Sequence, residues 1–98
     1  MFDKMKQLME MQKKMQEMKR ELDNADFEVT SPDSVLKIRM NGSQVVKEVN
    51  LLCDPKGLDK NNLEKAIKDA YNKAIKQSHD LAAQKMKDVS GLNIPGLF

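Results

Sequence analysis

Few side chains in this sequence are suited to catalysis. His79 is the only histidine and Cys53 the only cysteine, so no cluster of ligands for zinc or thiol–imidazole pair is evident. His79 falls on the polar side of a predicted helix, where we expect a solvated imidazole. Cys53 falls at the end of a predicted strand, where we expect a small buried thiol. We therefore predict no catalytic residue, no metal site, no cofactor and no small-molecule substrate.

Lysines form a second candidate site, and the chemistry they offer is the binding of phosphate groups. On a wheel of about 100° per residue, the polar side of the last predicted helix carries Lys65, Lys68, Asn72, Lys76, His79 and Lys87. Asp69 and Asp80 border this strip without interrupting it. Such a strip can follow a DNA backbone. A solvated, lysine-rich helix face explains the same residues equally well.

A second basic row lies on the first predicted helix, at every seventh residue. It consists of Lys6, Lys13 and Arg20. An acidic residue stands three positions before each of them: Asp3, Glu10 and Glu17. Pairs of this kind stabilise a helix surface by about 0.2–0.5 kcal/mol each and offset the basic charge. We therefore expect this row to contribute less to DNA binding than the strip on the last helix.

The first helix also carries an apolar stripe at alternating spacings of three and four residues: Leu8, Met11, Met15, Met18 and Leu22. This spacing is typical of a coiled-coil seam and predicts a partner helix, most simply the same helix of a second copy. Methionine thioethers also bind Cu(I), and methionine-rich surfaces also bind varied peptides, but heptad spacing favours packing. We predict a homodimer whose interface includes this stripe or the sheet beside it.

The periodicity predicts one α+β domain over residues 1–98, with the order α-β-β-β-α. Two long helices, over about 3–23 and 59–89, flank a three-stranded antiparallel sheet with strands at about 26–30, 35–40 and 44–52. Asn41-Gly42 predicts a tight hairpin turn with positive φ, and Asp59 predicts the N-cap of the last helix. Ser90-Gly91 predicts its end, followed by an irregular tail over 91–98.

The charge balance leaves the partner open. Seventeen basic and fifteen acidic side chains give a net charge of +2, which neither requires nor excludes nucleic acid. The single cysteine fits a reducing compartment. No signal peptide or membrane-spanning run is visible, so we expect a cytoplasmic protein without membrane contact.

With these elements laid out, the sequence resembles the YbaB/EbfC family of small bacterial nucleoid-associated proteins over essentially all 98 residues. The resemblance rests on the Met/Gln/Lys-rich first helix and on the order and spacing of short motifs: Asn41-Gly42, Asp54-Pro55, Ala70-Tyr71-Asn72-Lys73-Ala74, and Asn93-Ile94-Pro95-Gly96-Leu97-Phe98. Between the first two strands the sequence has Ser31-Pro32-Asp33-Ser34, where family members commonly carry a glycine-rich link.

The resemblance implies a homodimer with helices projecting from a sheet platform, which binds double-stranded DNA without catalysis. It also implies a place in the nucleoid and an influence on DNA organisation or transcription. The alternative is a protein-binding adaptor that uses the methionine-rich first helix. The salt dependence of binding distinguishes the two hypotheses, since phosphate contacts weaken steeply with ionic strength and an apolar interface does not.

Overall fold

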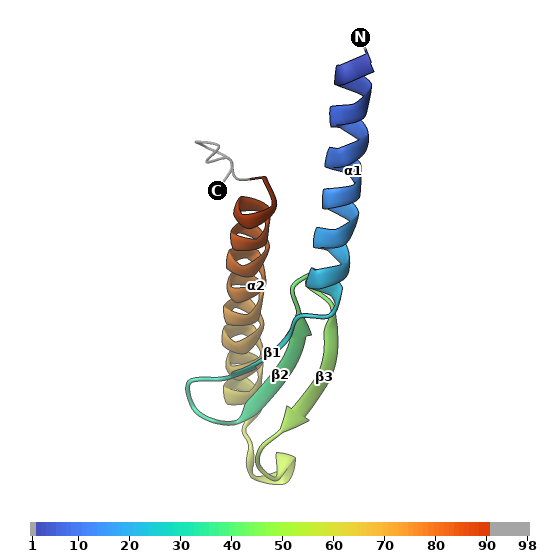
Figure 1. Ribbon diagram of the computed structural model, residues 1–98. Coiled ribbons are helices and arrows are strands. Elements are labelled where there is room, and N and C mark those ends of the chain that lie inside the picture. The colour runs from blue at the N-terminus through green and yellow to red at the C-terminus, as the bar shows by residue number, and fades with distance from the viewer. Residues whose placement is uncertain (1, 91–98) are drawn as a thin grey trace.

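The computed structural model describes residues 2–90, and the elements follow the predicted α-β-β-β-α order (Figure 1). These are α1 (Phe2–Asp23), β1 (Asp26–Thr30), β2 (Leu36–Asn41), β3 (Val46–Leu51), a short 3-10 helix η1 (Pro55–Gly57) and α2 (Lys60–Ser90). The predicted helix stop at Gly91 and the predicted irregular tail lie outside the described residues. None of the helices within residues 2–90 is long and apolar enough to cross a membrane.

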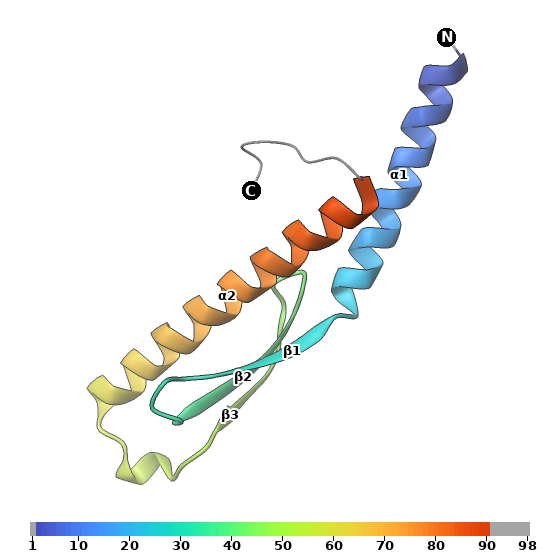
Figure 2. The same cartoon turned by 60° about the vertical axis from the view of Figure 1, so that its left-hand side comes forward.

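The sheet is antiparallel with the order β1-β2-β3, and α2 lies across one of its faces (Figure 2). Alternate residues of β2 point towards α2, and these side chains form the core with Val29 of β1 and two alanines of α2. The core residues are Val29, Leu36, Ile38, Met40, Ala70 and Ala74. The central strand is therefore covered by α2, while β3 remains an edge strand.

Small side chains at every fourth position allow α2 to approach the sheet closely. Ala66, Ala70, Ala74 and Ser78 are at most 1% exposed, and the Ser78 hydroxyl donates to the backbone oxygen of Asn41 at 3.1 Å. At the start of the helix, the Asp59 carboxylate accepts from the backbone N–H of Asn61 at 2.7 Å, which confirms Asp59 as the N-cap.

The loop between β2 and β3 differs from the predicted tight turn. The φ of Gly42 lies outside the left-handed region, and the positive φ falls instead on Gln44, at 64°. The backbone N–H of Asn41 donates to Val45 O at 3.1 Å and that of Gln44 to Asn41 O at 3.2 Å. This is a three-residue loop closed by a left-handed residue, and the prediction of positive φ at Gly42 was wrong.

Gly42 is required for a different reason, because it packs against the end of α1. A Cβ atom at this position would lie 2.7 Å from Leu22 Cδ2 and 3.2 Å from the Leu22 backbone oxygen. The Gly42 N–H donates to Leu22 O at 3.0 Å and to Ala25 O at 3.1 Å. The side-chain amide of Asn41 donates to Asp23 O at 3.1 Å. This junction between the hairpin loop and the last turn of α1 therefore holds α1 against the sheet.

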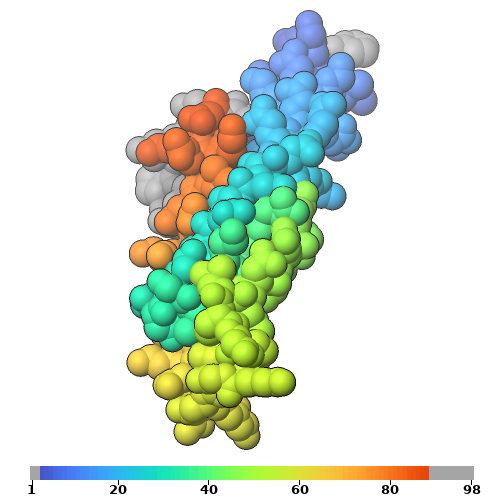
Figure 3. Space-filling view, turned by 90° about the horizontal axis from the view of Figure 1, so that it is seen from below, coloured from blue at the N-terminus to red at the C-terminus, as the bar shows by residue number. Residues whose placement is uncertain are grey.

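Beyond this junction, α1 extends away from the body formed by the sheet and α2 (Figure 3). The molecule measures 66 × 25 × 16 Å along its principal axes. Leu22 is buried within the single chain, Met18 is half-buried, and Met15, Met11 and Leu8 are exposed. The C-terminal end of the predicted seam is thus an intrachain contact, and the rest of the seam is uncovered among the described residues.

Candidate functional site

The predicted strip of polar residues lies on the outer face of α2. Lys65, Lys68, Asn72, Lys76, His79 and Lys87 are all exposed. The sheet fixes this orientation, since Ala66, Ala70 and Ala74 occupy the opposite side of the same helix turns. We refer to Lys65, Lys68, Asn72, Lys76 and Lys87 as the α2 strip.

The lysines of the α2 strip are available for an external anion. Among residues 2–90, ion pairs involve other basic side chains, and none involves Lys65, Lys68, Lys76 or Lys87. Among these lysines, Lys65 has acidic side chains close to it. It lies beside Asp33 and Asp69 in a shallow groove between α2 and the β1–β2 loop. The pKa of Asp33 is lowered chiefly by a hydrogen bond from Ser31, at 2.6 Å, and also by the positive charge of Lys65.

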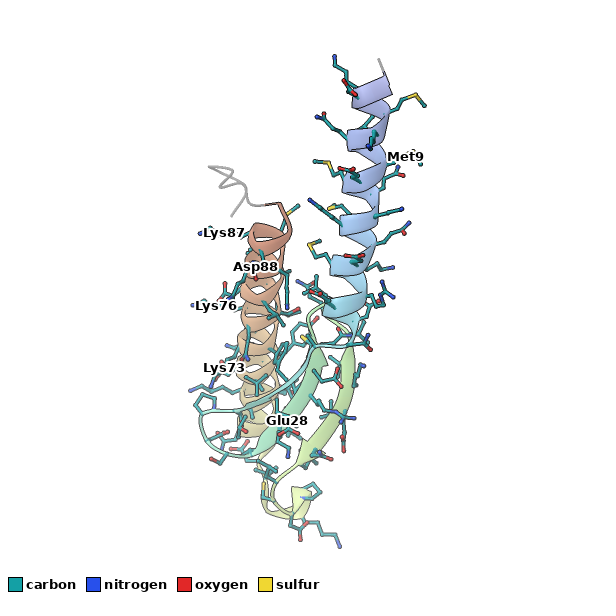
Figure 4. The ribbon with its side chains drawn as sticks, in the orientation of Figure 1. Met9, Glu28, Lys73, Lys76, Lys87 and Asp88 are labelled. Carbon is teal, nitrogen blue, oxygen red and sulfur yellow. The ribbon has the colours of Figure 1, made fainter. Side chains whose placement is uncertain are left out.

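Lys73 belongs beside this strip, although sequence analysis did not assign it. It is exposed, and Figure 4 shows Lys73, Lys76 and Lys87 on the side of α2 that points away from α1. On an ideal wheel Lys73 falls near Ala66, on the buried side. The buried side moves around α2, however, because its small residues repeat every four positions rather than every 3.6. That fourfold spacing was the signal that could have placed Lys73.

The basic row of α1 is exposed together with its acidic neighbours. Lys6, Lys13 and Arg20 face solvent, as do Asp3, Glu10 and Glu17. Near the junction with α2, Lys85 pairs with Glu21 at 3.4 Å. This surface carries charges of both signs in alternation, so its basic side chains lie close to acidic ones.

The outer face of the sheet, opposite α2, is also electrically balanced. Two ion pairs connect neighbouring strands there, Lys37–Glu28 at 3.6 Å and Arg39–Glu48 at 3.4 Å. A third, Lys47–Asp26 at 3.2 Å, joins β3 to β1 across the central strand. Each positive charge on this face therefore already has an acidic partner within the chain. The α2 strip is the more strongly basic of the two faces.

A DNA-binding function is also indicated by comparison with known proteins. Residues 1–92 match the YbaB/EbfC DNA-binding family. A nucleoid-associated protein of Clostridium kluyveri is 34% identical over 98 residues, which cover 96% of this chain and 84% of the relative. One of Dictyoglomus thermophilum is 36% identical over 102 residues, covering 99% of this chain and 96% of the relative.

The chain belongs to the YbaB/EbfC DNA-binding family. The family resemblance drawn from the sequence is thereby confirmed, and with it the two long helices and the three-stranded antiparallel sheet. The family is defined by DNA binding and not by a catalysed reaction.

The candidate catalytic side chains of this YbaB/EbfC protein are isolated on its surface. His79 is exposed, as predicted. Cys53 is exposed as well, so the prediction of a buried thiol was wrong. The reason is that β3 ends at Leu51 and the chain then leaves the sheet towards η1. Within residues 2–90 no group of three or more His, Cys, Asp and Glu side chains is placed to hold a metal ion.

This YbaB/EbfC chain exposes a second apolar surface that sequence analysis did not separate from the core. Val49 and Leu51 of β3 pair with Ile38 and Leu36, so they point to the same side of the sheet as α2 but lie beyond its cover. Ile67 and Tyr71 of α2 are exposed too. We call this set the β3–α2 surface: Val46, Val49, Leu51, Ile67 and Tyr71.

Proposed function

We propose that this YbaB/EbfC protein is a nucleoid-associated protein that binds double-stranded DNA through the α2 strip. The observation that carries the proposal is the row of exposed lysines along one face of α2, which form no ion pair with any other side chain of residues 2–90. Lys65 and Lys87 are separated by roughly 33 Å along the helix axis at about 1.5 Å per residue. One turn of B-DNA measures about 34 Å, so the strip matches that length.

The contacts in this proposal are to phosphates and not to base edges. Lysine ammonium groups are point charges that bind phosphate oxygens well and carry no information on sequence by that contact. Asn72 lies among them and can donate to phosphate as well. We therefore infer binding that is strong at low salt and similar on unrelated DNA sequences. Lys6, Lys13 and Arg20 of α1 supply secondary contacts.

We propose further that two copies associate through the β3–α2 surface. β3 is an edge strand with unpaired backbone groups on one side, and its exposed valines adjoin a helix with exposed Ile67 and Tyr71. The stripe on α1 was the sequence-based candidate for this interface. Since Leu22 is already buried within the chain, less of that stripe is available to a partner. A dimer doubles the number of lysines presented to DNA.

A mobility-shift titration at two salt concentrations tests the DNA-binding proposal. With about four phosphate contacts per protomer, the affinity is expected to fall between 50 and 200 mM salt by about 150-fold if one protomer contacts the duplex, and by about 20,000-fold if both copies of a dimer do. The fall should be equal on two unrelated duplexes. Binding that does not change with salt would contradict phosphate recognition. Absence of binding at 50 mM salt would favour the alternative hypothesis of a protein-binding adaptor. In that case the exposed apolar side chains of α1 would be the docking surface.

Two matched substitutions test the dimer interface. Val49→Ser is expected to raise the dimer Kd at least about tenfold, because it removes about 1.5 kcal/mol of apolar burial from each copy. Met11→Ser removes a side chain of similar exposure (57% against 55%) from α1 and should leave the Kd unchanged. Sedimentation of both variants over a dilution series measures this. A raised Kd for Met11→Ser together with an unchanged Kd for Val49→Ser would place the interface on the α1 stripe instead.

A further inference from the structure

The side chains of the apolar stripe of α1 become more exposed from the C-terminal end of the helix towards its N-terminal end. Leu22 is 7% exposed, Met15 is 44%, Met11 is 57% and Leu8 is 62% exposed. Leu22 packs at the junction where Leu81 of α2 also approaches Gly42. Because the stripe keeps a spacing of three and four, Met15, Met11 and Leu8 continue along the same side of α1 as Leu22. The stripe therefore becomes exposed where α1 passes beyond the end of α2.

The chain leaves α2 at that same place. The two helices run antiparallel in both ribbon views (Figures 1 and 2), and Lys85 pairs with Glu21 at 3.4 Å. From Lys85 to Ser90, the end of α2, the helix rises roughly 7.5 Å at about 1.5 Å per residue. That rise brings its end level with the part of α1 between Met15 and Met18. Residues 91–98 thus continue from the point where the stripe is uncovered.

The composition of residues 91–98 suits an apolar strip. The segment reads Gly-Leu-Asn-Ile-Pro-Gly-Leu-Phe and contains no charged side chain. Its large apolar residues are Leu92, Ile94, Leu97 and Phe98. Eight residues reach up to about 26 Å at roughly 3.3 Å per residue. The exposed stripe from Met15 to Leu8 is only about 10 Å long at roughly 1.5 Å per residue, so the segment is long enough to cover it.

A second copy of α1 fits the same strip less well. Lys14 and Lys19 flank the stripe at the positions that face each other across a parallel pair of helices. Two parallel copies of α1 would therefore bring lysines together at the edge of the seam. An uncharged segment of the same chain meets no such repulsion.

We propose that residues 91–98 bind along the exposed part of the α1 stripe of their own chain, over Met15, Met11 and Leu8. The segment replaces the cover that α2 gives to Leu22 and supports the half of α1 that extends from the body. This intrachain contact goes beyond DNA binding and does not depend on it, since it uses the apolar side of α1 and not its basic row.

Methionine-methyl NMR of the full chain without DNA tests the proposal. In the double variant Leu97→Ser/Phe98→Ser, the methyl signals of Met11 and Met15 are expected to shift, while Met40, fully buried under α2, reports an unchanged fold. The matched control is Leu52→Ser, which changes an exposed leucine (47% exposed) outside both the stripe and residues 91–98. This control should leave the methyl signals of Met11 and Met15 unshifted. Unchanged signals in the double variant would overturn the proposal.

A spin label distinguishes the chain's own segment from that of a second copy. In a Cys53→Ser background, a nitroxide on Phe98→Cys is expected to broaden the Met11 and Met15 methyl signals of the same chain, and reduction of the nitroxide should restore them. In a mixed sample, spin-labelled chains without isotope are combined with isotope-labelled chains without nitroxide. The mixed sample should show no broadening. Broadening in the mixed sample, or no broadening in either sample, would overturn the intrachain assignment.

Discussion

Replacing Gly42 with valine is expected to lower the free energy of unfolding by about 3 kcal/mol, and replacing it with alanine by about 1–2 kcal/mol. The new Cβ would lie 2.7 Å from Leu22 Cδ2 and 3.2 Å from both the Leu22 backbone oxygen and Leu81 Cδ2. The side chain of Leu22 can adjust, but its backbone oxygen accepts a hydrogen bond from Gly42 itself. The added volume therefore separates α1 from the hairpin loop.

Gly57 provides the control for this prediction. Nothing lies within 4 Å of a Cβ built there, so Gly57→Ala should change the free energy of unfolding by no more than about 0.5 kcal/mol. Urea denaturation of the variants measures the difference. All variants are compared at one protein concentration, since association of copies would add to the measured stability. Equal stabilities of Gly42→Ala and Gly57→Ala would show that the junction tolerates a side chain at Gly42.

Changing Lys65, Lys68, Lys76 and Lys87 together to glutamine is expected to produce the largest loss of DNA affinity. Each lost phosphate contact makes the slope of log affinity against log salt shallower by about 0.9, or by about 3.6 for the four lysines of each protomer. Glutamine retains the helix propensity of lysine, and these side chains are exposed and unpaired within residues 2–90. The fold should therefore survive, which circular dichroism can verify.

The basic row of α1 serves as the comparison. Lys6, Lys13 and Arg20 changed to glutamine should reduce the slope less, because Asp3, Glu10 and Glu17 already offset their charge. The affinity of the α2 variant should fall by the same factor on unrelated duplexes. A wild-type affinity in the α2 variant together with a severe loss in the α1 variant would assign the main contact to α1. No loss in either variant would favour the adaptor hypothesis.

The sequence predicted those parts of the fold that depend on local periodicity and caps. The heptad spacing on α1 and the N-cap Asp59 each reflect interactions within a few residues of one another. Gly42 shows the limit of such arguments. Its local context suggested a positive φ, whereas its actual constraint comes from Leu22, twenty positions earlier, and from Leu81 on α2.

The candidate site was predictable to the same extent. The exposure of the α2 strip could be predicted from the helical period. The exposure of Lys73 could not, because Ala66, Ala70 and Ala74 contact the sheet at every fourth residue and not at every 3.6 residues. The exposed state of Val49, Ile67 and Tyr71 depends on how far α2 extends over the sheet. That extent is a property of the packed structure, and no window of the sequence contains it.

The junction at Gly42 also determines the mechanics of α1. Without the proposed contact of residues 91–98, the 22-residue helix is held only near Leu22 and behaves as a lever arm about 33 Å long at roughly 1.5 Å per residue. A rotation of about 10° at its base displaces the far end by about 6 Å at that length, comparable to the separation of adjacent phosphates along a DNA strand. Small changes in the contact between Leu22 and the hairpin loop are therefore amplified along α1, to about 4.5 Å at Lys6, which lies about 25 Å from Asp23 at roughly 1.5 Å per residue.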